Sequence, residues 1–494
     1  MNRFRANMVR FIVAGLWLFI PLWFLAAQED GDFGFGFEDE PDSARTASGP
    51  RVQVSGEVAA QILGFGDDFS SEERFKKASV GDIFSGKLNF AASAFNADGV
   101  INLKLAPVWD GSSPVSIDEA YLRVYFGKLD VEGGLRKLTW GKADSFGPLD
   151  VVNPLDYSDL STMTDLAGIK LARPLLHLSY SLGAFSKLEG VFIPGFAGHH
   201  FAQDGRWAPA QVTGYAEMIE SRIMKGIASL APLLLSPPPG THQDLTDPTG
   251  AGIQKIRAYY ADMDMPSLYP PTSGLEYAQA GLRFTTTVGS SDLGIQYFFG
   301  NLFRPAVTIT GEAQFLQDPY GIRPDIRYNR YHQIGADYAQ VIAGFNLRAE
   351  LAANITSDLS GDDGQVYNPA IAWSLGFDRD LFWGINLNCQ GTESIRLLSV
   401  GDDPALDTEA GTDMSSTRII LTLSRKFLRD ELELKTTGIW DIEDKGFYIL
   451  PALIWTKGDV EAELSGGIFG GDEQGELGQY RKNGFIKVVL TYSF

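Results

Sequence analysis

Apolar and polar residues alternate one by one along much of the chain, beginning near residue 51. The last dozen residues show the pattern clearly: Leu490, Tyr492 and Phe494 fall on one parity, and Lys487 and Thr491 fall on the other. Successive side chains of a β-strand point to opposite faces, so this period of two predicts a strand with one apolar and one polar face. The chain is therefore expected to be built from amphipathic strands.

The same alternation recurs in the middle of the chain. Leu347 and Leu351, for example, alternate with Arg348 and Glu350. In a membrane barrel the apolar parity meets lipid and the polar parity lines the interior. No apolar run of about 18 residues follows the first 27 residues, which excludes a bundle of membrane helices. The inward-facing residues predicted on this basis include Arg123, Arg136, Arg283, Arg348, Glu350, Asn386, Asn388, Glu461 and Glu463.

Two classes of connection separate the predicted strands, and they alternate strictly. Short turn signals lie at 96–99, 127–130, 173–174, 289–292, 341–344, 378–380, 428–430 and 457–459. Longer polar segments lie at 64–81, 110–116, 140–165, 194–273, 312–324, 356–365, 398–415, 441–445 and 470–480. Nine long loops and eight turns indicate an all-β fold, an antiparallel up-and-down transmembrane barrel of about 18 strands, with 16 strands as an alternative. A soluble sandwich would share the alternation within a strand but not this spacing.

The first 27 residues have the composition of a secretory signal peptide. Arg3, Arg5 and Arg10 precede an apolar run over 11–25, and Ala26 and Ala27 provide the small residues of a cleavage site. The run is short for a membrane-spanning helix, although a retained N-terminal anchor is the alternative. Residues 28–50 are rich in Gly, Phe and acidic residues and are predicted to form a flexible periplasmic leader, which leaves 51–494 for the barrel.

The charge of the chain argues against nucleic acid as a partner. The formal net charge is −21, and it becomes about −24 once the signal peptide is removed. Phosphate binding requires basic patches, which this composition does not favour. Cys389 is the only cysteine, so no intrachain disulfide can form, and a closed network of strand hydrogen bonds is expected to supply stability.

The third long segment carries a motif of the form W-G … D-x-x-N-P-x-D. Its residues are Trp140, Gly141, Asp150, Asn153, Pro154 and Asp156. This motif resembles a family of large Gram-negative outer-membrane barrels of poorly defined function, which are porin-like in build and distantly similar to polysaccharide-export barrels. The C-terminal strand, with Leu490, Tyr492 and Phe494, resembles the closing strand that the barrel-assembly machinery reads as a sorting signal. The resemblance implies a place in the outer membrane of a diderm bacterium and brings no catalytic residue with it.

The same segment, 140–165, is a candidate for a constriction loop folded into the barrel. Its Gly-Pro and Asn-Pro pairs, at 147–148 and 153–154, force turns. In one hypothesis four loop acids face two lysines across an eyelet, namely Asp144, Asp150, Asp156 and Asp159 against Lys137 and Lys142. In the alternative, the Asp side chains cap backbone N–H groups and only fasten the loop to the wall.

The longest interruption of the strand pattern is 194–273. A set of aliphatic residues within it follows helical spacing, and the set comprises Ile219, Ile223, Ile227, Leu230 and Leu234. Three prolines and a glycine at 237–240 end this predicted amphipathic helix. A loop of this length either enters the lumen as a plug or gate, or caps the surface by packing on neighbouring loops.

Candidate chemistry beyond the barrel wall is sparse. His199 and His200 are adjacent, and adjacent residues seldom ligate one ion without distant partners, so neither a metal nor a cofactor is predicted. A phospholipase of the Ser-His-Asn type would need a lipid-facing histidine, whereas His177 lies on the polar parity. The chain is therefore interpreted as non-enzymatic.

The predicted inward side chains favour a channel. Basic groups cluster in the N-terminal half of the wall and acidic groups in the C-terminal half, which predicts a transverse field across a water-filled pore. We expect an outer-membrane channel for passive diffusion of small solutes, surrounded by lipid; the oligomeric state is left undetermined. One alternative is a transporter of hydrophobic compounds or fatty acids with an internal plug, which strand 446–456, apolar on both faces, supports. The other is a surface adhesin displayed on a barrel.

Overall fold

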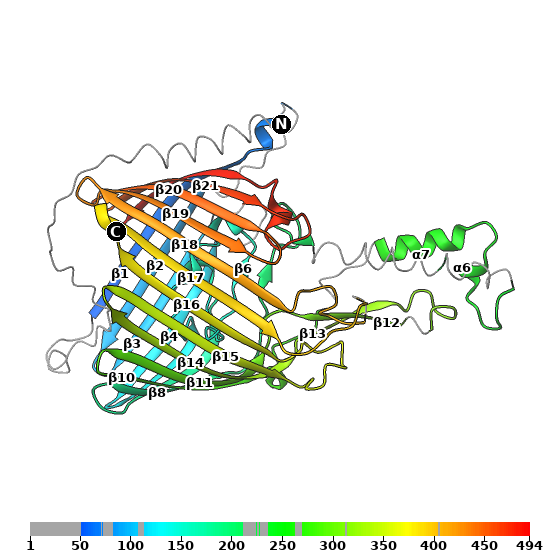
Figure 1. Cartoon of the computed structure of the whole chain (residues 1–494), viewed down its shortest axis with the longest axis horizontal. Helices are drawn as coiled ribbons and strands as arrows, with labels where there is room; N and C mark the ends of the chain where they lie inside the picture. The colour runs from blue at the N-terminus through cyan, green and yellow to red at the C-terminus, as the bar shows by residue number, and fades with distance from the viewer. Residues whose placement is uncertain are drawn as a thin grey trace. The chain divides into compact units, whose positions relative to one another are not determined.

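Eighteen antiparallel strands form a closed barrel (Figure 1). The computed structural model describes residues 51–494 except 71, 73–82, 107–112, 211–223, 225–226, 228–235, 262–268, 312–313 and 404–405. The predicted signal peptide (1–27) and leader (28–50) therefore lie outside the described residues. The barrel strands are β1 (Arg51–Phe65), β2 (Phe84–Ala94), β3 (Ala97–Leu105), β4 (Val115–Phe126), β5 (Leu129–Arg136), β7 (Arg173–Ser181), β8 (Ser186–Ile193), β10 (Gln279–Val288), β11 (Ser291–Asn301), β14 (Arg330–Ile342), β15 (Phe345–Thr356), β16 (Ala370–Asp380), β17 (Ile385–Arg396), β18 (Ser415–Phe427), β19 (Leu432–Asp441), β20 (Phe447–Lys457), β21 (Val460–Gly470) and β22 (Phe485–Ser493).

The barrel closes because the last strand pairs with the first. In the ladder of β1 with β22, Val58 lies opposite Tyr492 and Ala60 lies opposite Leu490. The main-chain N–H groups of Gly56 and Phe494 each donate to the carbonyl oxygen of the other residue at 2.9 Å. The other ladders join successive barrel strands, so the antiparallel barrel is confirmed at 18 strands and the 16-strand alternative is excluded. Closure gives the backbone groups of both terminal strands hydrogen-bond partners, as a membrane requires.

Short turns and long loops lie at opposite ends of the barrel. The turns have two to four residues and lie at the left of Figure 1, where the C-terminus also lies. One predicted turn is wrong: Arg173 and Pro174 begin β7, and the turn lies at 182–185, where Gly183 has a φ of 120°. Pro174 is at the start of a strand, where a missing N–H donor is tolerated, so it does not mark a turn. Residues 166–169, which directly follow the predicted loop 140–165, form the short helix α3 (Leu166–Ile169).

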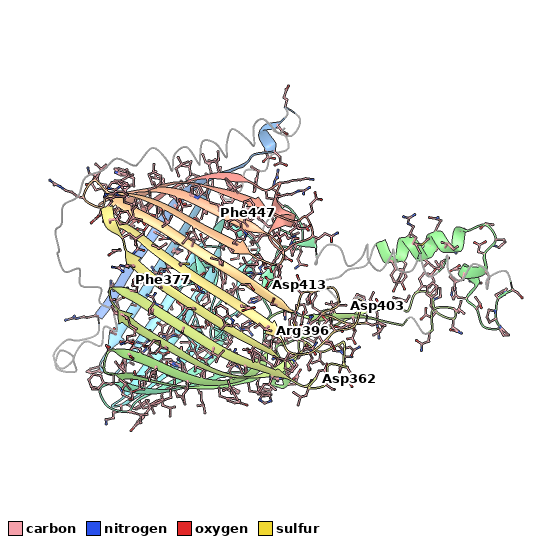
Figure 2. All side chains as sticks on the ribbon, in the orientation of Figure 1. Asp362, Phe377, Arg396, Asp403, Asp413 and Phe447 are labelled. Carbon is pink, nitrogen blue, oxygen red and sulfur yellow. The ribbon has the colours of Figure 1, made fainter. Side chains whose placement is uncertain are left out.

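The outward parity of the strands is apolar and exposed, as the alternation predicts. On β22, Leu490 is 52% exposed and Tyr492 is 51% exposed, whereas Lys487 lies opposite the buried Ser465 and faces the interior. Aromatic side chains lie near both ends of the wall, including Phe377 near the short turns and Phe447 near the long loops (Figure 2). Rings at these depths are typical of the two interfaces of a membrane.

Within the described ranges, no helix is both long enough and apolar enough to cross a membrane.

The fourth and fifth long loops share a hydrophobic core of their own. Helices α6 (Gln243–Thr246) and α7 (Ala251–Ala261) belong to the fourth loop, and strands β12 (Ala306–Thr310) and β13 (Arg323–Arg327) belong to the fifth. The buried residues of this core are Ile227, Leu245, Ile256, Tyr260, Ile309, Phe315 and Ile322. This part of 194–273 therefore packs on a neighbouring loop, as the cap alternative expects.

The amphipathic helix predicted within 194–273 is described at two positions only. Met224 and Ile227 are helical, and Ile227 is buried in the core that the two loops share. The other residues of the predicted stripe, Ile219, Ile223, Leu230 and Leu234, lie outside the described residues.

Candidate functional site

The third long loop, 137–172, runs inside the barrel as two lobes. We call 139–152 the inner lobe, because it lies against the inward face of β10 to β17, and 155–169 the mouth lobe. The short elements of the mouth lobe are β6 (Asp156–Tyr157), the 3-10 helix η3 (Leu160–Thr162) and α3. The candidate constriction loop thus enters the lumen, and the wall residues that hold it define the site.

Glu350 on β15 holds the tightest part of the inner lobe. Its carboxylate accepts the backbone N–H groups of Lys142, of Ala143 at 2.7 Å and of Leu149 at 3.2 Å. A Cβ on Gly141 would lie 2.2 Å from a Glu350 oxygen, and one on Gly147 would lie 2.6 Å from the other. Glycine is therefore required at both positions for the loop to approach the carboxylate this closely.

Three glutamines on the wall complete the attachment of the inner lobe. Gln296 on β11 donates to the carbonyl oxygen of Leu149, and Gln333 on β14 donates to that of Pro148, both at 2.9 Å. Gln390 on β17 accepts from the Ser145 N–H and donates to the Phe146 carbonyl oxygen, both at 3.0 Å. An amide side chain offers both a donor and acceptors, so it can satisfy a loop backbone that has no strand partner.

Aromatic packing seals the inner lobe against the wall. The Trp140 ring meets the Phe298 ring edge-on, with centroids 6.3 Å apart. A Cβ on Gly281 would lie 2.6 Å from the Trp140 ring, so this β10 position must be glycine for the ring to fit. Leu149 is fully buried, and its side chain lies over Gly335 of β14. The lobe is therefore packed like a protein interior.

The motif residues Asp150 and Asn153 contact the two ends of the third loop. The Asn153 side chain accepts from the Leu138 N–H at 2.7 Å and donates to the carbonyl oxygens of Arg136 at 3.0 Å and Leu171 at 2.8 Å. Asp150 pairs with Lys170 at 2.6 Å, and both side chains are largely buried. These contacts join the start of the third loop to its end, so Asp150 and Asn153 hold the loop in place as the alternative to the eyelet expects.

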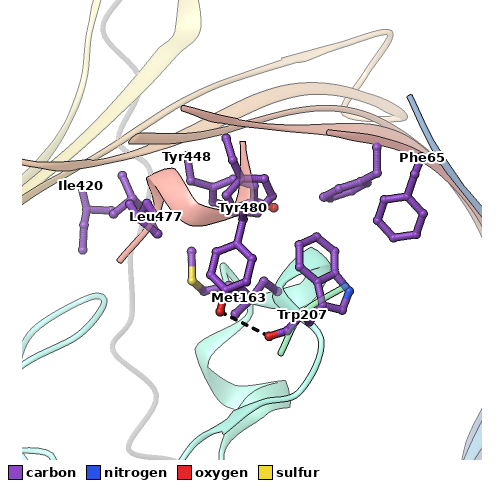
Figure 3. Packing of buried hydrophobic residues seen from close by; sticks show 11 residues of the cluster. Phe65, Met163, Trp207, Ile420, Tyr448, Leu477 and Tyr480 are labelled. Atoms are coloured by element: carbon purple, nitrogen blue, oxygen red, sulfur yellow. Dashed lines mark hydrogen bonds between the residues drawn. The ribbon is translucent and has the colours of Figure 1, made fainter. Parts of the chain in front are cut away.

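The mouth lobe reaches the part of the wall formed by β18 to β22 and β1. It contributes Leu160 and Met163 to a hydrophobic cluster at the long-loop end (Figure 3). The other members are Phe65, Trp207, Ile420, Ile439, Tyr448, Phe469, Leu477, Tyr480 and Phe485. Tyr448 and the partly buried Leu450 line the inward face of β20, so the apolar inward face predicted for this strand contacts loops. Together the two lobes extend from one side of the lumen to the other.

A two-residue parallel pairing joins the mouth lobe to the fourth loop. β6 pairs with β9 (His200–Phe201), and His200 bonds Asp156 at 2.9 Å. The His199 Nδ1 accepts the Leu155 N–H at 2.9 Å, and burial together with nearby Arg304 lowers the pKa of His199 from 6.5 to about 4. The neutral His199 ring therefore takes part in the contact between the mouth lobe and the fourth loop.

Asp156 stays ionised at the same contact. Burial raises the pKa of Asp156, but hydrogen bonds from Ser158 and from His200 outweigh burial and hold the pKa below its usual value. Its side chain accepts the Ser158 N–H at 3.0 Å. Neither adjacent histidine lies in a group of three or more His, Cys, Asp or Glu residues suited to a metal ion, and the described residues contain no such group.

The six residues predicted to form an eyelet have separate partners. Lys137 pairs with Asp118 on β4 at 2.8 Å, and Lys142 lies 3.5 Å from Asp292 on β11. Asp144 bonds Arg348 at 2.6 Å, and the remaining acids bond Lys170, His200 or the backbone of η3. The structure thus brings Asp144 to the wall but does not set the four acids opposite the two lysines.

Several of the predicted inward residues contact the loop or other polar residues of the wall. Asn388 donates to Asp144 at 2.9 Å, Asn386 donates to Asp380 at 2.8 Å, and Arg283 pairs with Asp337 at 2.7 Å. Glu461 lies opposite Thr491, and Glu463 lies opposite Val489, on the inward side of β22.

The predicted separation of charge between the two halves of the wall is wrong. In the N-terminal half, Glu132 pairs with both Arg123 and Arg136. Lys87 pairs with Glu57 at 2.6 Å. The prediction counted the bases of the inward parity and missed acids on neighbouring strands, so it overstated the transverse field.

Solved structures with which the chain aligns include three of low sequence identity. OccK2 (OpdF) of Pseudomonas aeruginosa is 10% identical, with 90% of this chain and 97% of that chain covered at a TM-score of 0.46. A BenF-like porin from Pseudomonas fluorescens is 8% identical, with 90% and 98% covered at 0.45. OmpF of Salmonella typhi in complex with daunomycin is 8% identical, with 90% and 98% covered at 0.40. No family model and no curated protein matches the sequence. The assignment of a closed barrel rests on the pairing of its own strands.

Proposed function

We propose that this chain is an outer-membrane channel through which small solutes diffuse passively, and that its third loop sets the aperture. The observation that carries the proposal is the inner lobe, which Glu350, Gln296, Gln333 and Gln390 attach to the inward wall. A loop held by side chains of four strands narrows the lumen without sharing the strand ladder. The aperture is then fixed by the fold and does not depend on a moving lid.

The outer face supports the placement in a membrane. Outward residues such as Ile295 and Ile334 are 60% and 57% exposed, which would be unfavourable in water and is favourable in lipid. A closed barrel satisfies every strand hydrogen bond without an edge. We propose lipid and the barrel-assembly machinery as partners, with Leu490, Tyr492 and Phe494 as the assembly signal.

The inner face supports passage of water and polar solutes. Away from the loop, Lys87, Lys104 and Arg123 remain partly exposed although each has a carboxylate partner. Paired charges of both signs along a wall favour hydrated solutes over apolar ones.

Planar-bilayer recording of the refolded protein tests the channel directly. We expect discrete conductance steps from the full barrel. A bilayer that stays silent with the wild-type protein, while the same sample shows the heat-modifiable gel mobility of a closed barrel, would rule out the proposed function.

One observation favours a transporter of apolar compounds as the second candidate. The cluster around Trp207, Tyr448 and Phe469 lies inside the barrel at the long-loop end, and the buried Tyr448 hydroxyl has no hydrogen-bond partner among the described residues. An apolar solute could replace loop side chains in such a cluster. Uptake of a fatty acid into vesicles that contain the protein, abolished by Trp207→Asp while the conductance of small ions persists, would favour this candidate over the first.

A further inference from the structure

We propose that a groove on the outer wall binds one acyl chain of an anionic membrane lipid, with Arg330 at the head-group end. The groove has a volume of about 500 Å³ and crosses β7, β8, β10, β11 and β14. Its lining is almost wholly apolar. The proposal shares with the proposed function only the placement of this wall in a membrane, and its test measures bound lipid instead of conductance.

The register of the strands explains why the wall is hollow here. One outward row runs Leu176, Phe192, Ala280, Phe299 and His332 across the strands. Ala280 is the small member of this row, between two phenylalanines, so the surface dips at its position. The rings on either side form the walls of the dip.

The next outward row continues the dip toward the middle of the wall. It runs Leu178, Gly190, Leu282 and Tyr297. Gly190 has no side chain, and the leucine side chains on either side of it protrude from the surface. The small residues of the two rows are diagonal neighbours, so the dip is continuous over two rows, as a flexible hydrocarbon chain requires.

A cation lies at the long-loop end of the groove. Arg330 occupies the next outward position on β14, opposite Asn301. Its guanidinium lies 4.9 Å from the centroid of the Phe299 ring, and it donates to the carbonyl oxygens of Ala278, at 2.7 Å, and Glu276. Ala278 is two residues before Ala280, so these bonds hold the positive charge directly above the dip. A guanidinium has five N–H donors, and these two bonds leave others for an anion.

A second polar group lies beside the first. The Tyr297 hydroxyl and the His332 Nδ1 are 2.7 Å apart on the outward face, and the His332 ring centroid lies 4.9 Å from that of Phe299. This leaves the Nε2 of His332 on the side of the ring away from the tyrosine. The groove thus has apolar side chains toward the middle of the wall, aromatic rings above them and a cation at its long-loop end. An anionic lipid has the same order of parts, with acyl chains in the membrane core and a phosphate at the surface.

The wall elsewhere supplies a matched control. Gly391 on β17 is also outward, opposite the exposed Leu375, but the nearest atom to a Cβ there is the Trp373 ring at 4.0 Å. A Cβ on Gly190 would meet only the Leu282 side chain, at 3.5 Å, which is ordinary van der Waals contact. Both glycines therefore tolerate a side chain, and only the one at 190 opens onto the groove.

Native mass spectrometry of the purified full chain in a non-ionic detergent tests the site. Dioleoyl phosphatidylglycerol is titrated as the probe, with dioleoyl phosphatidylcholine and inorganic phosphate as comparisons. We expect one phosphatidylglycerol per barrel at low lipid concentration. Gly190→Leu should bind it about tenfold more weakly, because the leucine side chain fills the space of the acyl chain. Binding should be unchanged in Gly391→Leu. Heat-modifiable mobility verifies that each variant is folded.

The head-group end is tested separately. Arg330→Gln is expected to weaken phosphatidylglycerol binding about fivefold and to leave phosphatidylcholine binding unchanged. Arg379→Gln is the control, because Arg379 also lies over a ring, Phe345, at 4.3 Å, but near the short turns. Equal lipid binding by Gly190→Leu and wild type, binding of inorganic phosphate alone, or a second copy of the chain in place of the lipid would each overturn the proposal.

Discussion

The Glu350 carboxylate accepts hydrogen bonds from three backbone N–H groups of the third loop. In a strand, these N–H groups would donate to the carbonyl oxygens of a neighbouring strand. The inward orientation of Glu350 follows from parity alone, because Leu347 and Leu351 are outward. The identity of its partners does not follow from the sequence, because they lie about 200 residues earlier in the chain. The partner of Asp150 is equally hard to predict. The sequence indicates that Asp150 lies in a turn, but its ion pair with Lys170 depends on the path by which the loop goes back to the wall.

Glu350→Gln is expected to loosen the inner lobe while the barrel stays closed. Glutamine keeps the size of the side chain but offers one carbonyl oxygen and an NH₂ group, so at least one loop N–H loses its acceptor. Each such loss costs about 1–3 kcal/mol. Single-channel recordings should show larger current fluctuations, and a protease should cleave within 141–149 more readily. Glu433→Gln is the control, since Glu433 lies on the inward face of β19, opposite Ile454. Identical behaviour of the two variants would contradict the role given to Glu350.

The contact at His199 is expected to weaken in acid. Burial, with a smaller effect of Arg304, lowers the pKa of His199 to about 4, below the 6.5 of an unperturbed ring. The unfolded loop then binds a proton at a higher pH than the folded loop, so this contribution to stability is complete above about pH 6.5 and is lost as the pH falls toward 4. Proteolysis of the fourth loop should therefore increase between pH 7 and pH 4.5. His199→Asn supplies an acceptor that does not titrate and should remove this increase, whereas His242→Asn should retain it.

The alternation of apolar and polar residues predicts the strands well and the turns less well. β15 and β17 follow their predicted parities throughout, because one face of each strand contacts the lumen and the other the exterior. The turn at 182–185 carries only one glycine as a signal, whereas Arg173-Pro174 resembles a turn and begins a strand. The inner lobe of the third loop has no regular period, because side chains from the wall hold its backbone in place of a strand ladder.

Removal of Phe494 is expected to impair assembly more than conductance. The residue exchanges two main-chain hydrogen bonds with Gly56, and its ring lies so close that a Cβ on Gly56 would be 2.8 Å from it. The deletion therefore removes the end of the ladder that closes the barrel. We expect less protein in the outer membrane, with unit conductance unchanged in the molecules that do assemble. Normal membrane insertion of the truncated chain, measured against a Tyr492→Phe control, would contradict this.

Within the described part of the chain, three hydrophobic cores connect the loops to the wall or to each other. One seals the inner lobe to the wall, with Trp140 and Phe298 as members. A second joins the mouth lobe to the opposite wall through Trp207 and Tyr448. A third holds the fourth and fifth loops to each other through Ile256 and Tyr260. The sequence predicts the barrel and the presence of an inward loop, but the grouping of loops into cores depends on contacts between distant segments.

Excision of the inner lobe tests whether the barrel and its aperture are separable. Replacing 141–149 by a short Gly-Ser linker removes the segment bonded to Glu350 and the glutamines but none of the barrel strands. The ends of the excised segment are already close, because Asp150 pairs with Lys170, whose ammonium group also bonds the Thr139 hydroxyl at 2.7 Å. We expect heat-modifiable mobility to persist and single-channel conductance to rise. The matched control replaces 243–261, which belongs to the core of the fourth and fifth loops, and should leave conductance unchanged. If the control raises conductance and the inner-lobe excision does not, the aperture is set by the fourth loop.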